Sequence, residues 1–84
     1  MDSSQALDRQ LVAVVRDAMR ASGRSQRDIS DATGIPLVTL SRRLSGAGKG
    51  FTVEELLTVA DALGISLVEL AVRAERRSAQ ATAA

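Results

Sequence analysis

Apolar side chains recur every three or four residues over 4–22, and charged residues fall largely between them. This spacing places the apolar positions on one side of an α-helix. They are Leu7, Leu11, Val14, Val15, Ala18 and Met19. Gly23 follows at the position where a left-handed residue commonly ends a helix. The pattern predicts a first helix over about 4–22 that supports the core, preceded by a frayed end over 1–5.

A shorter pattern over 25–34 predicts a second helix. Ser25 and Asp28 stand three residues apart, as the two partners of a capping box do, although Glu or Gln is commoner than Asp at the second position. Ile29 and Ala32 supply an apolar face. Gly34 can adopt the positive φ that closes a helix and reverses the chain, so a tight turn is expected here.

A third helix is predicted over about 36–45. Pro36 suits its start, because the first N–H groups of a helix have no internal partner in any case. Helical spacing turns Leu40 and Leu44 toward the core, and Gly46 ends the helix. The outward positions are Leu37, Val38, Thr39, Ser41, Arg42 and Arg43. Inward and outward positions therefore separate cleanly.

The loop over 46–50 contains three glycines and Lys49. It lacks the full pattern of a nucleotide-binding P-loop, and no strand is predicted before it. Two interpretations stand equally at this point. The loop is a plain connector, or Lys49 contacts a phosphate of DNA.

Two further helices are predicted from repeated start signals. Thr52 and Glu55 form a capping box, with Phe51 and Leu56 at the hydrophobic-staple positions. Ser66 and Glu69 repeat the pattern, with a staple formed by Ile65 and Leu70. The positions expected to be apolar and inward are Leu56, Leu57, Val59, Ala60 and Leu63 in the fourth helix, and Leu67, Val68, Leu70, Ala71 and Ala74 in the fifth.

These elements predict an all-α fold, a compact five-helix domain over 4–77 that contains a helix-turn-helix. The residues over 78–84 have no apolar periodicity, so a disordered tail is expected there.

The amino-acid composition excludes several kinds of catalytic and metal-binding site. The 84 residues include no Cys, no His and one Phe. Disulfides and Cys-based metal sites are therefore excluded, and the commonest general base and metal ligand is missing. No catalytic constellation appears, and neither an enzyme activity, a small-molecule substrate, a metal nor a cofactor is expected.

Targeting signals are not seen in this sequence. No stretch approaches the roughly 20 apolar residues of a membrane span, and the first residues lack the features of a signal peptide. We therefore expect a cytoplasmic, nucleoid-associated protein with no membrane partner.

Charge is segregated along the chain although the net charge is only +1. Between Arg20 and Lys49 six basic residues face two acids, whereas 50–72 contains four acids and no base. The basic segment coincides with the predicted second and third helices. Such polarity orients a domain in the field of a polyanion. Ordinary scatter of surface charge is the alternative.

Two short helices joined by a tight turn form a helix-turn-helix, whose second helix can lie in the major groove of DNA. Double-stranded DNA is therefore the expected partner. Arg42 is the first candidate for base reading, because an Arg fork can donate two bonds to guanine. Arg24, Arg27 and Arg43 are candidate phosphate contacts.

The order of motifs resembles the Cro and lambda-repressor type of helix-turn-helix domain, also called the XRE family. The resemblance rests on Ser-Gln at 25–26, Ala-x-x-Gly-Ile at 32–35, Thr-Val-Glu-Glu-Leu-Leu at 52–57, Ala-x-Ala-Leu-Gly-Ile-Ser at 60–66 and Glu-Leu at 69–70. It covers roughly 11–70. It implies sequence-specific binding to duplex DNA and, usually, transcriptional repression in a phage or bacterium.

Carried onto this sequence, the resemblance implies roles for individual residues. Gln26 matches a backbone-contacting Gln, and Lys49 matches a basic loop after the recognition helix. The positions that face base edges or adjacent phosphates are matched by Pro36, Leu37, Val38, Ser41 and Arg42. Leu37 and Val38 depart from the polar readers common in the family, and Arg43 followed by Leu44 suggests an additional phosphate-facing Arg.

Combining both lines of reasoning, the expected base-reading residues are Leu37, Val38, Ser41 and Arg42, and the expected phosphate contacts are Arg24, Gln26, Arg27, Pro36, Arg43 and Lys49. The apolar pair, Leu37 and Val38, fits thymine methyl groups or a contact with protein equally well. A protein-interaction module, such as an antitoxin or adaptor, is therefore the alternative function. A homodimer and a monomer on DNA both remain open.

Overall fold

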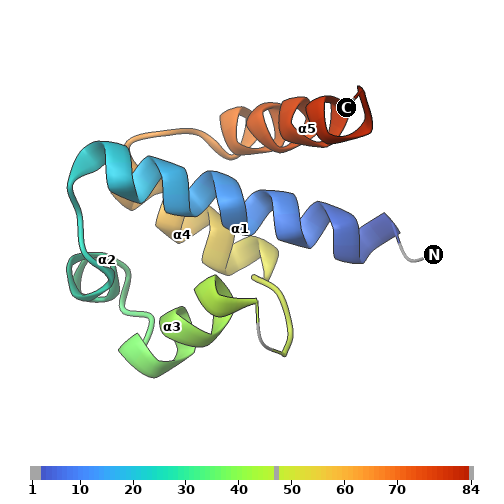
Figure 1. The fold of residues 1–84 in the computed structure, drawn as a ribbon. Helices are drawn as coiled ribbons and strands as arrows, with labels where there is room; N and C mark the ends of the chain where they lie inside the picture. The colour runs from blue at the N-terminus through green and yellow to red at the C-terminus, as the bar shows by residue number, and fades with distance from the viewer. Residues whose placement is uncertain (1–2, 47, 84) are drawn as a thin grey trace.

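The computed structural model describes residues 3–46 and 48–83, and these residues form five helices (Figure 1). They are α1 (Ser3–Ser22), α2 (Gln26–Thr33), α3 (Leu37–Ser45), α4 (Val53–Leu63) and α5 (Leu67–Ala83). The predicted all-α fold is confirmed, and the helix boundaries fall within a few residues of the sequence expectation except at the end of α5. None of the described helices is both long and apolar enough to cross a membrane.

Two capping boxes fix the starts of α2 and α4. The Asp28 amide donates to Ser25 Oγ at 3.1 Å, and Asp28 Oδ2 accepts from the Ser25 amide at 2.9 Å. The Thr52 and Glu55 pair forms the same two bonds at 3.0 and 2.9 Å. Two hydrogen bonds hold the pKa of Asp28 below its ordinary value. The bond from the Ser25 backbone N–H has the larger effect, and the bond with the Ser25 side chain comes second. Two of the three predicted capping boxes are therefore confirmed in full.

The start of α5 differs in one detail. The Glu69 amide donates to Ser66 Oγ at 3.0 Å, as predicted. The Glu69 carboxylate accepts a bond from Arg73 Nε at 2.9 Å, one turn further along the helix. The carboxylate thus pairs with an Arg at i+4, and among the described residues no bond joins it to the Ser66 amide. Only one of the two bonds of this predicted capping box therefore forms.

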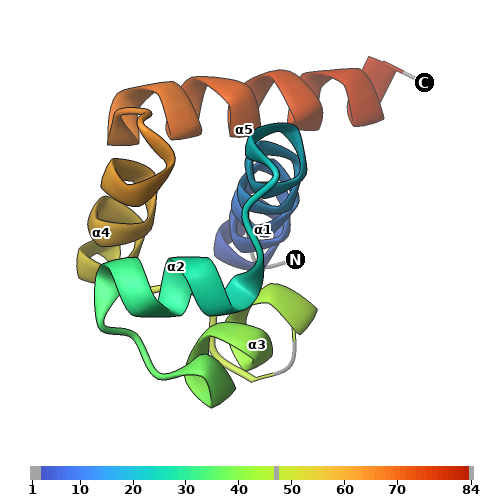
Figure 2. The same ribbon diagram turned by 90° about the vertical axis from the view of Figure 1, so that its left-hand side faces the viewer.

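α3 and α5 lie at opposite ends of the molecule, with α1 between them (Figures 1 and 2). α1 packs chiefly against α5 and also contacts α3 and α4, while α2 packs against α3 and α4. The helix-turn-helix is thus held at one end by α1 and α4, and α5 supports the other side of α1.

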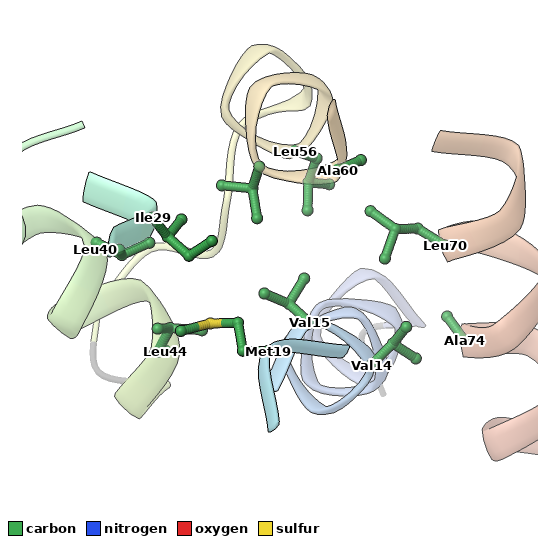
Figure 3. Close-up of a cluster of buried hydrophobic side chains, with 11 residues drawn as sticks. Val14, Val15, Met19, Ile29, Leu40, Leu44, Leu56, Ala60, Leu70 and Ala74 are labelled. Carbon is green, nitrogen blue, oxygen red and sulfur yellow. The ribbon is translucent and has the colours of Figure 1, made fainter. Parts of the chain in front are cut away.

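One hydrophobic core joins all five helices (Figure 3). α1 contributes Val14, Val15 and Met19, and α2 contributes Ile29. The remaining buried members are Leu40 and Leu44 of α3, Leu56, Val59 and Ala60 of α4, and Leu70 and Ala74 of α5. Leu40 and Leu44 are inward, as predicted, so the orientation of α3 is set by the core.

Several apolar residues expected in the core are instead exposed, namely Leu7, Ala32, Leu57, Val68 and Ala71. In α4 and α5 the apolar residues occupy more of the circumference than the neighbouring helices cover. Each helix of so small a domain is covered by neighbours on one side, so apolar residues beyond that side stay in solvent. Leu7 lies toward the start of α1, seven residues before the buried Val14.

The expectation of a disordered tail over 78–84 is wrong for the described part, because α5 continues through Ala83. Residue 84 lies outside the described residues. Arg77 donates to Asp17 Oδ2 at 2.9 Å and to Gln10 Oε1 at 3.3 Å, which ties this part of α5 to α1 beyond the core. The following Ala, Gln and Ser residues are compatible with a helix that buries little.

Candidate nucleic-acid interface

The turn between α2 and α3 is fixed by a small hydrogen-bond network. Gly34 has φ of +80° and donates to the Ser30 carbonyl at 2.9 Å. Ser30 Oγ donates to the Ile35 carbonyl at 2.6 Å, and the Ile35 amide donates to Thr33 Oγ1 at 3.2 Å. A residue with a Cβ is strained at such a φ, which explains the glycine. The angle between the two helices is therefore set locally.

The outward side of α3 is open to solvent. Leu37 is 39% exposed and Val38 is 67% exposed, and Ser41 and Arg42 are also exposed. The side chains on the opposite side, Leu40 and Leu44, are buried. The structure therefore places the four expected base-reading residues together on one free surface.

The flanking positions are also accessible in part. Arg27, Pro36 and Lys49 are exposed, and Gln26 in the first turn of α2 is half-buried. Within residues 3–46 and 48–83, no hydrogen bond or ion pair engages the side chains of Gln26, Arg27 or Lys49. These side chains are available to a ligand.

Arg24 does not project freely, although the sequence suggested a phosphate contact. Its Nη1 donates to the Ala62 carbonyl at 2.6 Å, near the carboxyl end of α4. A cation is favourable there because the last carbonyls of a helix lack internal partners. Arg24 thus braces the segment between α1 and α2 against α4.

Arg43 departs from the expectation that it faces outward. Its Nε and Nη2 bind the two Glu55 carboxylate oxygens at 3.0 and 3.5 Å, and its Nη1 donates to the Lys49 carbonyl at 3.3 Å. The side chains of Arg43 and Glu55 are only 20% and 19% exposed. Arg43 follows the buried Leu40 by three positions, so it lies beside the inward face of the helix. It joins α3, the following loop and α4.

The ion pair also sets the protonation of Glu55. Burial by itself raises the pKa of this carboxyl group. Hydrogen bonds from the Arg43 side chain and the Thr52 backbone, with the Arg43 charge, outweigh burial and hold the pKa below its ordinary value. Glu55 therefore stays ionised at neutral pH and pairs with the Arg43 charge.

A surface groove of about 440 Å³ lies between α1 and the carboxyl end of α3. We call it the α1–α3 groove. It is lined by Asp8, Arg9, Val12, Arg16, Arg43, Leu44, Ser45, Gly46, Gly48, Lys49 and Gly50. At one side of the groove the backbone at Gly50 passes close to the Asp8 side chain. A Cβ atom added to Gly50 would lie 2.9 Å from the Asp8 carboxyl carbon. Only glycine allows this approach without a shift of Asp8.

Sequence reasoning had assigned no role to Arg9 and Arg16, which line this groove. Their spacing of seven residues places them on one side of a helix. The helical pattern, however, does not say which later segment packs beside that side. The groove forms between α1 and residues 27 to 42 positions later in the chain, so it becomes visible only in the fold.

Cations without a protein partner gather at this end of the molecule. In the described part of the chain, the Arg and Lys side chains that have no ion pair or hydrogen bond are Arg9, Arg16, Arg27, Arg42, Lys49 and Arg76. The first five lie on α2, on α3 or along the α1–α3 groove, and only Arg76 is on α5. Free cations therefore outnumber free acids beside α3, where Asp8 lines the groove and Asp31 lies on α2.

Comparison with known proteins agrees with this geometry. A family model described as helix-turn-helix, HTH_3, matches residues 15–70, which include all of α2, α3 and α4. The comparison with curated proteins and that with solved structures each give no significant match. The match spans most of the chain and confirms the family resemblance of the sequence. The chain belongs to the XRE, or lambda-repressor-type, helix-turn-helix family of DNA-binding regulators.

Proposed function

We propose that this protein is a sequence-specific transcriptional regulator, acting as a repressor of bacterial or phage type, that inserts α3 into the major groove of duplex DNA. The observation that carries the proposal is the exposed outward side of α3, flanked by cations without protein partners. The family membership supports DNA as the partner and the resemblance supports repression.

Base reading is assigned to the outward side of α3. The Arg42 guanidinium is free to donate two bonds to guanine O6 and N7, a contact that discriminates by about 1–3 kcal/mol. Leu37 and Val38 offer apolar contacts for thymine methyl groups. Ser41 is small and can donate to or accept from a base edge.

Phosphate contacts are assigned to exposed or partly exposed positions around α3, among which Pro36, having no N–H, can only pack beside a phosphate. Gln26 and Arg27 lie in the first turn of α2, Pro36 precedes α3, and Lys49 lies in the loop after it. Contacts of this kind set the register of a protein on the duplex without reading sequence. Arg24 and Arg43 are instead assigned to bracing, because each already binds a partner within the protein.

The experiment begins with selection of bound sites from a random duplex pool, followed by affinity measurements at several salt concentrations. Arg42→Ala should weaken binding to the selected site by about 5- to 150-fold while binding to random duplex changes little. Lys49→Ala should weaken binding to both duplexes alike and flatten the log–log salt dependence by about 0.9. Arg76→Ala on α5 serves as the control and should resemble wild type.

Equal losses on selected and random duplex for Arg42→Ala would remove its assigned role as a base reader. The stoichiometry of the same titration distinguishes a monomer from a homodimer on half-sites about one helical turn apart.

The alternative function is a protein-interaction module, such as an antitoxin or adaptor, and the exposed apolar pair, Leu37 and Val38, favours it. Titration with random duplex at low ionic strength separates the two functions. A DNA-binding domain binds under these conditions with strong salt dependence. No detectable binding would instead support the interaction module.

A further inference from the structure

We propose that the α1–α3 groove is a phosphate-binding site for the DNA backbone, in which Arg9 and Arg16 extend the interface beyond the carboxyl end of α3. The proposal rests on the proposed function, because it takes α3 to be the helix that enters the major groove. It adds a second element, α1, to the interface that the helix-turn-helix motif provides.

The positions of Arg9 and Arg16 carry the first step. Both line the groove, both are exposed, and neither has a side-chain partner among the described residues. A separation of seven residues corresponds to about 10 Å along the axis of α1. The two guanidinium groups are thus presented in a row along one wall.

The charge of the groove carries the second step. Lys49 adds a third free cation to the lining of the groove, and Asp8 is the acid among the lining residues. Arg43 lines the groove too, but it already pairs with Glu55. The free side chains therefore give a net positive site. Guanidinium groups bind phosphate with two parallel hydrogen bonds, which makes phosphate the chemistry that best fits this wall.

The position of the groove indicates the source of the phosphate. α3 has nine residues and is therefore about 13.5 Å long, close to the roughly 12 Å width of the major groove. Residues just past the end of a helix that lies across the groove meet the sugar–phosphate backbone. Leu44, Ser45 and Gly46, at the end of α3, line the α1–α3 groove. The site is thus placed where a backbone strand would pass.

The test compares Arg9→Gln and Arg16→Gln with Arg76→Gln, which removes the same charge from α5 at the other end of the molecule. Binding to selected and to random duplex is measured as a function of salt concentration. Each groove variant should flatten the log–log salt dependence by about 0.9 on both duplexes, and the double variant by about twice that amount. Arg76→Gln should leave the slope unchanged. Circular dichroism melts check that all variants remain folded.

The outcomes separate the two proposals. If wild type binds duplex and the groove variants match Arg76→Gln, the groove is not part of the interface, while the proposed function stands. If wild type binds no duplex at low salt, both proposals fail together. Titration with pyrophosphate alone tests whether a free anion is the source of the phosphate. The assignment to DNA would be overturned if pyrophosphate bound saturably, Arg9→Gln abolished that binding, and the same variant left the salt dependence of DNA binding unchanged.

Discussion

The ion pair between Arg43 and Glu55 should contribute measurably to stability, unlike most pairs at protein surfaces. Each side chain is about one-fifth exposed, and two nitrogen–oxygen contacts at 3.0 and 3.5 Å join them. Glu55 also accepts from the Thr52 amide at 2.9 Å. The pair therefore links the end of α3 to the first turn of α4.

The magnitude follows from this partial burial. Fully exposed pairs contribute about 0–1 kcal/mol, whereas hydrogen bonds to charged groups with restricted solvent contribute about 1.5–3 kcal/mol. The geometry of Arg43 and Glu55 lies between these limits. We expect a coupling free energy of about 1–2 kcal/mol.

The assay is a double-mutant cycle with Arg43→Met, Glu55→Gln and the double variant, measured by urea unfolding. The pKa of Glu55 lies below its ordinary value of 4.5, so ionisation of this group stabilises the folded state above that pH. The stabilisation is lost as the pH falls through the pKa in the folded protein. The coupling should therefore be complete at pH 7 and should decrease in acid below about pH 4.5.

A coupling below about 0.3 kcal/mol at pH 7 would show that the pair behaves as an ordinary surface pair. A coupling that stays constant from pH 7 to strongly acidic conditions would also refute the reasoning, because a protonated carboxyl group carries no charge to pair with Arg43.

Two further predictions concern the core and the end of α5. Leu40→Ala should reduce the free energy of unfolding, measured with urea, by about 2–5 kcal/mol, because Leu40 is fully buried. A much smaller loss would show that α3 repacks around the smaller side chain. Truncation after Arg77 should change the free energy of unfolding by about 0.5 kcal/mol or less, because residues 78–80 are exposed. A loss above about 1 kcal/mol in a thermal melt would contradict this expectation.

Local signals allowed much of the fold to be predicted. The capping boxes at Ser25 and Thr52 join residues three apart, so their geometry depends on little beyond the helix itself. The glycine that ends α2 is likewise a local requirement. The division of α3 into a buried and an open side follows from helical spacing alone, and the positions of Leu40 and Val38 confirm it.

Contacts between distant segments were not predictable in the same way. Arg24 binds a carbonyl 38 residues away, and Arg43 binds an acid 12 residues away. Long flexible side chains reach partners that only the packed helices bring near, so charge and spacing alone suggested free cations. Leu57 and Val68 were misplaced because the pattern shows which residues are apolar but not how many neighbours surround a helix. The roles of the outward residues in binding DNA stay predictions.

The orientation of α3 depends on Leu40 and Leu44, while Leu37, Val38, Ser41 and Arg42 take no part in the core. On the proposed function, the base-reading positions can therefore vary with little effect on the fold. A library randomised at these four exposed positions should yield mostly well-folded variants, from which domains with new operator preferences can be selected. The same scaffold would then serve as an interchangeable reader for engineered gene switches.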